Sequence, residues 1–92
     1  MANVIITLKI MPESPEIDLK KISEEAKNKI SDFAGPGEMK IEEQPVAFGL
    51  KALNITFVMD ESKGSTEPLE ESISEIKGVQ SVEVTDVRRA IG

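Results

Sequence analysis

The residues of this 92-residue chain that could do chemistry are carboxylates, a phenylalanine at a turn and two adjacent arginines. The acids gather at Glu42 and Glu43, at Asp60 and Glu61, and along residues 67–75. The chain has no histidine and no cysteine, which removes the usual general base, the thiol nucleophiles and most zinc and copper sites. We therefore expect no catalytic residue, no cofactor and no bound metal, and we expect that the protein is not an enzyme.

The carboxylate groups lack the spacing of an ion or nucleotide site. A calcium loop places its acids as D-x-[DN]-x-[DN]-G, and residues 60–64 do not. No phosphate loop of the form G-x-x-x-x-G-K-[ST] occurs. The acids of residues 67–75 lie off the apolar stripe of Leu69, Ile73 and Ile76, so a solvated helix face explains them better than a site does.

The aromatic residue that stands apart is Phe48, which falls at a tight turn and is followed by Gly49. A phenylalanine at a turn either folds back on the core or projects toward a partner, and the residues alone slightly favour the core. Because turn tips accept polar residues easily, an aromatic side chain there is also a candidate contact site.

Arg88 and Arg89 form a basic pair near the end of an otherwise acidic chain. Seventeen acids against eleven bases give a formal net charge of −6, which argues against general binding to a phosphate backbone and against direct nucleic-acid binding. The arginine pair is either a solvated chain end or a cation directed at phosphate or carboxylate. No apolar run is long enough to span a membrane, and we expect a cytoplasmic protein.

Periodic patterns predict the elements that must position these residues. Four segments have the pattern of β-strands: residues 4–10, 39–46, 52–59 and 79–84. Apolar residues at three- and four-residue steps predict helices over residues 19–33 and 69–76. The first helix is expected to start at a cap, either Ser14 or Asp18, and to stop at Gly35-Pro36-Gly37. After residue 84 the strand phase breaks, so that Val87 is expected on the opposite face.

The order β-α-β-β-α-β predicts an α+β fold, a ferredoxin-like two-layer sandwich with an antiparallel four-stranded sheet and two helices on one face. The first and third strands are expected at its centre, and the proline of residues 39–46 suits an edge. The length leaves room for one core, so residues 1–92 are expected to form a single domain. Phe57 falls in the inward phase, and no aromatic side chain is expected on the open face to stack RNA bases.

Residues 46–55, with the sequence VAFGLKALNI, resemble the signature of the nucleotide-exchange domain family of translation elongation factor 1-beta. Residues 69–73 (LEESI) and 79–84 (VQSVEV) match the family as well. The resemblance covers nearly the whole chain and is strongest after Pro45. The length and the order of elements are similar to those of the archaeal members, which consist of this domain alone.

The resemblance implies a guanine-nucleotide exchange factor that promotes GDP release and GTP reloading on elongation factor 1-alpha, the GTPase that carries aminoacyl-tRNA. It implies that Phe48 wedges into the GTPase, that Gly49 permits the turn, and that the GDP-bound and nucleotide-free GTPase is the partner of a monomer. The family has a C-terminal lysine directed at the magnesium and phosphate site, and Arg89 stands at that position. Arginine is a departure, as is the extension through residues 90–92, and Arg88 is a second candidate for the role.

Two other function classes remain as alternatives. The first is a small regulatory or assembly domain that binds a ligand or a second copy, for instance through the edge strand at residues 39–46. The second is a small enzyme such as an acylphosphatase on the same fold, but the chain lacks the Gly-rich anion loop followed by a basic residue that this enzyme needs.

Overall fold

The computed structural model describes residues 3–35 and 37–90 of the chain. It contains four strands and two helices, in the order β1 (Asn3–Pro12), α1 (Leu19–Ala34), β2 (Met39–Pro45), β3 (Lys51–Asp60), α2 (Glu67–Ser74) and β4 (Val79–Ala90). Two short 3-10 turns, Ala47–Gly49 and Glu61–Lys63, border β3. Pro36 of the predicted helix stop and residues 91 and 92 of the C-terminal extension lie outside the described residues.

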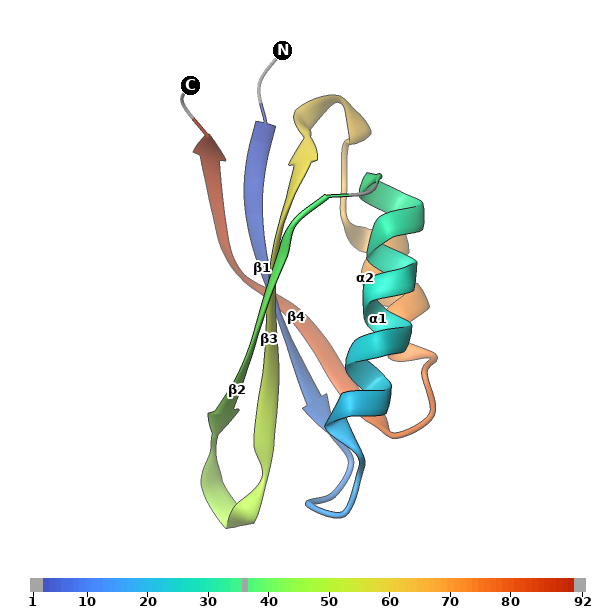
Figure 1. Cartoon of the computed structure of the whole chain (residues 1–92), viewed down its shortest axis with the longest axis vertical. Coiled ribbons are helices and arrows are strands. Elements are labelled where there is room, and N and C mark those ends of the chain that lie inside the picture. The colour runs from blue at the N-terminus through green and yellow to red at the C-terminus, as the bar shows by residue number, and fades with distance from the viewer. Residues whose placement is uncertain (1–2, 36, 91–92) are drawn as a thin grey trace.

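The four strands form one antiparallel sheet in the order β2-β3-β1-β4. Figure 1 shows both helices on the same side of this sheet, which leaves the other face open. The predicted ferredoxin-like α+β fold is therefore confirmed. The best-alternating strands, β1 and β3, are central as expected, and the proline-containing β2 is at an edge.

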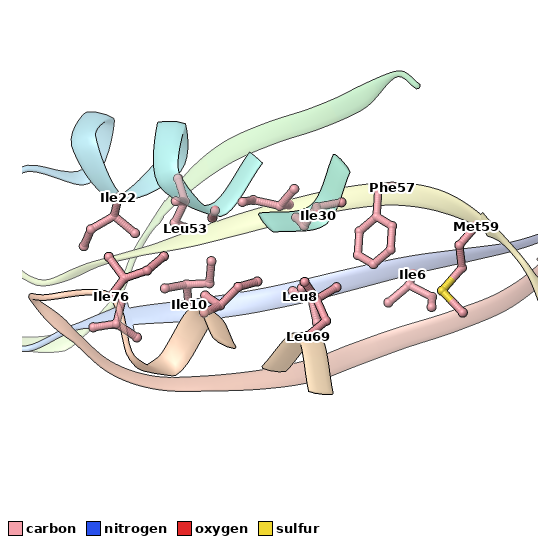
Figure 2. Close-up of a cluster of buried hydrophobic side chains, with 14 residues drawn as sticks. Ile6, Leu8, Ile10, Ile22, Ile30, Leu53, Phe57, Met59, Leu69 and Ile76 are labelled. Carbon is pink, nitrogen blue, oxygen red and sulfur yellow. The ribbon is translucent and has the colours of Figure 1, made fainter. Parts of the chain in front are cut away.

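The core lies between the sheet and the two helices (Figure 2). Every second residue of β1 points into it: Ile6, Leu8 and Ile10. Phe57 of β3 is 2% exposed, which confirms that it belongs to the core. The opposite face carries both polar and apolar side chains, among them Ile5 and Val58, and the Thr7 and Thr56 hydroxyls hydrogen bond there at 3.1 Å.

The helix starts follow the sequence signals. Asp18 caps α1, because the backbone N–H of Lys20 donates to its carboxylate at 3.0 Å; Ser14, the other predicted cap, lies outside the helix. At α2 the Ser65 hydroxyl accepts from the backbone N–H of Glu67 at 3.1 Å. These contacts satisfy N–H groups that the first turn of a helix leaves without partners.

Strand β4 departs from the predicted pattern. It continues to Ala90, and its pairing with β1 shifts by one residue at Thr85, which has no partner residue across the ladder. Asp86 therefore pairs with Thr7 and Val87 with Ile6, so Val87 lies on the same face of the sheet as the core residues, beyond the part that the helices cover, and is 60% exposed. The expectation that Val87 lies on the opposite face is wrong, because a β-bulge inserts one extra residue and restores the phase.

Gly78, at the turn between α2 and β4, is a position where the backbone and the packing both require glycine. Its φ is +97°, a conformation that residues with a side chain rarely adopt. A Cβ atom there would lie 3.0 Å from Cγ2 of Ile17 and 3.3 Å from its Cδ1. The turn thus brings the start of β4 against the loop that follows β1.

We predict that Gly78→Ala lowers the free energy of unfolding by more than about 1 kcal/mol, because the substitution adds both backbone strain and a steric contact. Denaturant unfolding followed by circular dichroism measures this change. Gly37→Ala is the matched control, since nothing lies within 4 Å of a Cβ atom there and its φ is outside the left-handed region. Equal stability of the two variants would contradict the assignment.

Candidate functional site

The tip of the β2–β3 hairpin holds Phe48 in an unusual backbone conformation. Phe48 has φ 62° and ψ 31°, and Gly49 follows with φ 76°. The Leu50 N–H donates to the Ala47 carbonyl at 3.2 Å and closes the turn. Two successive residues with positive φ are the geometry of the hairpin turns that favour Asn-Gly, because their twist matches that of the strands. A phenylalanine at the first of these positions is an outlier.

The Phe48 side chain is also exposed. It leaves 94% of its surface accessible, so the slight preference of the sequence for a core position is wrong. The hairpin tip lies at one end of the sheet, and no helix covers it (Figure 1). A strained backbone that presents an apolar ring to solvent gains nothing from burial, and such strain is typical of functional sites.

A shallow cleft of about 300 Å³ adjoins the hairpin tip. Gly49 and Lys51 form one side of it, and Pro15 and Ile17 of the β1–α1 loop form the other. Across the hairpin, Nζ of Lys51 lies 3.9 Å from Oε1 of Glu43. Because the cleft is shallow and lies next to an exposed phenylalanine, it is better suited to contact with a protein surface than to enclosing a small molecule.

Arg88 and Arg89 lie near the end of β4 and point to opposite faces of the sheet. Arg88 pairs with Ile5 on the open face, and its Nε lies 2.9 Å from Oδ2 of Asp86. Arg89 pairs with Val4 on the helix side, and its Nη2 donates to Oε1 of Glu61 at 3.0 Å. Both ion pairs are exposed, so each contributes at most about 1 kcal/mol to stability.

The structure does not bring Phe48 and the arginines together. Figure 1 shows the hairpin tip at one end of the sheet and the C-terminal end of β4 at the other. Arg88 is level with Ile5 and Val58, and Val58 lies seven residues along β3 from Lys51. At about 3.3 Å per residue, this is ~23 Å of strand. Phe48 and the arginines therefore lie at opposite ends of an elongated molecule.

The loop after β3 carries Glu61, a residue to which the sequence analysis gave no role. Asp60 accepts a hydrogen bond from the backbone N–H of Ser62 at 2.8 Å, and this bond, with that of the Ser62 hydroxyl, lowers the pKa of the Asp60 carboxyl. The capped turn carries Glu61, the partner of Arg89. The pairing of β1 with both β3 and β4 could have indicated the contact between Glu61 and Arg89. Both pairings are antiparallel, so they bring the end of β3 and the end of β4 to the same level.

Within residues 3–35 and 37–90, no polar or charged residue is buried, and no three acidic side chains are placed to hold a metal ion.

The sequence model of the EF-1 guanine nucleotide exchange domain matches residues 5–90. The chain belongs to this family. The activity that gives this family its name is guanine nucleotide exchange.

Several relatives of this exchange domain are archaeal proteins named elongation factor 1-beta. Those of Methanosphaera stadtmanae and Methanothermobacter thermautotrophicus are 52% and 48% identical over 97% of this chain and 98% of their own length. The protein of Methanosarcina barkeri is 42% identical over 97% of this chain and 99% of its own. No helix in the described part of the exchange domain is both long and apolar enough to cross a membrane.

We predict that Phe48→Gly is at least as stable as the unmodified protein, because no buried surface is lost and glycine adopts a positive φ without strain. Phe48→Val is expected to lower the free energy of unfolding by about 1 kcal/mol or more, because a β-branched residue is the least suited to this conformation. Thermal unfolding of the three proteins measures the order. A loss of about 3 kcal/mol in Phe48→Gly would instead indicate a buried ring.

Proposed function

We propose that this protein promotes the release of GDP from elongation factor 1-alpha, and so allows the GTPase to reload with GTP. The observation that carries the proposal is Phe48, an exposed phenylalanine held in a left-handed conformation at the hairpin tip. The family assignment supports nucleotide exchange, and the name of the relatives supports an elongation factor as the target.

Phe48 acts as a wedge in this proposal. An exchange factor binds the nucleotide-free GTPase more tightly than the GDP-bound form, and by linkage it weakens GDP binding by the same factor. A thousandfold acceleration of release requires the barrier to fall by roughly 4 kcal/mol. An aromatic side chain buried at an interface contributes about 2 kcal/mol or more, so the wedge supplies a large share. Gly49 allows the turn that presents it.

Arg89 is the proposed cationic contact. It stands where the family has a lysine directed at the magnesium and phosphate site, and its guanidinium offers a planar set of donors suited to phosphate or carboxylate. Arg88 is the weaker candidate, because it points to the open face and pairs with Asp86 on its own strand. A cation at this site would displace or replace magnesium at the GDP phosphates. The contribution of Arg89 to the exchange rate would therefore be greatest at high magnesium concentration.

The separation of the two contacts bears on how the GTPase is engaged. Phe48 and Arg89 are at opposite ends of the sheet, so one GTPase that meets both must extend along the length of the domain. A rigid sheet between them fixes their spacing. Binding at one end would then position the other, which is how two modest contacts combine into one effective site.

We expect that a substoichiometric amount of this protein accelerates release of a fluorescent GDP analogue from purified archaeal elongation factor 1-alpha. Stopped-flow fluorescence measures the rate, and the chain contributes little signal because it has no tryptophan or tyrosine. Absence of acceleration with a GTPase shown to be active would contradict the proposal. A dimer that buries Phe48, detected by light scattering, would then favour the regulatory or assembly domain.

Phe48→Ala should slow exchange about 30-fold or more, the rate equivalent of ~2 kcal/mol, while the protein stays folded. Asn28→Ala is the control, because Asn28 is an exposed neutral residue on α1. An exchange rate for Phe48→Ala equal to that of the control would remove the wedge role.

Arg89→Ala should slow exchange about tenfold, as expected for loss of a hydrogen bond to a charged group, and Arg88→Ala about twofold or less. The deficit of Arg89→Ala should grow with magnesium concentration, and Arg89→Lys should retain activity. Rates that match the unmodified protein at every magnesium concentration would exclude Arg89 from the site.

A further inference from the structure

We infer that Glu61 is a positioning residue for Arg89, which it orients toward the GTPase without occupying all of its donors. The inference rests on the proposed function. It starts from the 3.0 Å contact between Oε1 of Glu61 and Nη2 of Arg89, which joins the loop after β3 to the last strand.

The position of Glu61 is built into the fold. Asp60 pairs with Asn3 at the end of β3, and Asn3 pairs with Ala90 on the other side, so the loop and the end of β4 are level. The Asp60 carboxylate accepts from the Ser62 N–H at 2.8 Å and holds the turn Glu61–Lys63 in place. Glu61 is thus carried by a capped turn next to the strand that carries Arg89.

The contact orients Arg89 rather than blocking it. A guanidinium has five N–H donors, and Glu61 engages Arg89 through a single nitrogen. The Arg89 side chain remains 66% exposed, so its other donors are accessible to an anion of a partner. Arg88 differs, because its acceptor Asp86 lies two residues back on the same strand and links it to no second element.

Orientation matters because arginine has more rotamer freedom to lose on binding than most side chains. A side chain already held in one direction loses less of this freedom when a partner binds. Glu61 also carries a negative charge near the proposed phosphate contact. Its hydrogen bond to Arg89 therefore favours binding of the partner's anion, whereas its charge opposes that binding. A neutral glutamine keeps an acceptor oxygen without that charge.

Exchange kinetics with a small set of variants test the inference. Glu61→Ala should lower kcat/KM for GDP release about two- to fivefold, the range expected for loss of an exposed ion pair, with most of the change in KM. Glu61→Gln should restore most of this loss. Glu71→Ala is the matched control, because Glu71 is an exposed acid of α2 and its loss changes the net charge equally.

The double variant separates positioning from other roles. If Glu61 acts through Arg89, the combination Glu61→Ala with Arg89→Ala should equal Arg89→Ala alone. Additive losses would overturn the inference, and so would faster exchange in Glu61→Ala, which would mean that Glu61 competes with the anion of the partner.

The two failures are distinguishable. If the unmodified protein does not accelerate release, the proposed function fails. If it does, and Arg89→Ala is slower while Glu61→Ala matches the unmodified protein, the positioning role alone is wrong. Nitrogen-15 relaxation of the Arg89 Nε–H group gives a readout that needs no GTPase. Its order parameter should fall in Glu61→Ala and stay unchanged in Glu71→Ala; equal values in all three proteins would also overturn the inference.

Discussion

Alternation of buried and open side chains along β1 is the constraint on which the rest of the molecule depends. Ile6, Leu8 and Ile10 are at most 3% exposed, and β1 pairs with a strand on each side. A slip of one residue on either side would turn an apolar row toward solvent. The register is therefore fixed by burial, and it determines which residues reach the two ends of the sheet.

The two features that do not belong to the core lie at the two ends of the sheet. At one end a turn with two positive φ values presents Phe48, and at the other an ion pair links Arg89 to the loop after β3. Neither feature contributes much to stability: one is strained and unburied, and the other is a solvated charge pair. In the proposed function, both groups lie where they add little to stability, and the stable core serves as a spacer between them.

The sequence predicted the parts of the structure that depend on apolar burial. Strand centres, helix stripes and the α1 cap at Asp18, one of the two predicted positions, follow from periodicity and from hydrogen-bonding side chains close in the chain. Phe48 was misplaced because a turn signal specifies a reversal of the chain without specifying where the ring goes. Thr85 was missed because a bulge depends on the partner strand, and Glu61 because its contact with Arg89 spans 28 positions.

The bulge at Thr85 determines on which face of the sheet each arginine lies. The Thr85 hydroxyl donates to the Thr7 carbonyl at 3.4 Å, and beyond this point each β4 side chain lies on the face opposite to the one that simple alternation would give it. If Thr85 instead took a regular place in the ladder, the faces of Arg88 and Arg89 would be exchanged, while their order in the chain would stay the same. In a relative, the presence or absence of this bulge, and not the residue count alone, therefore decides which cation lies on the face that Arg89 occupies.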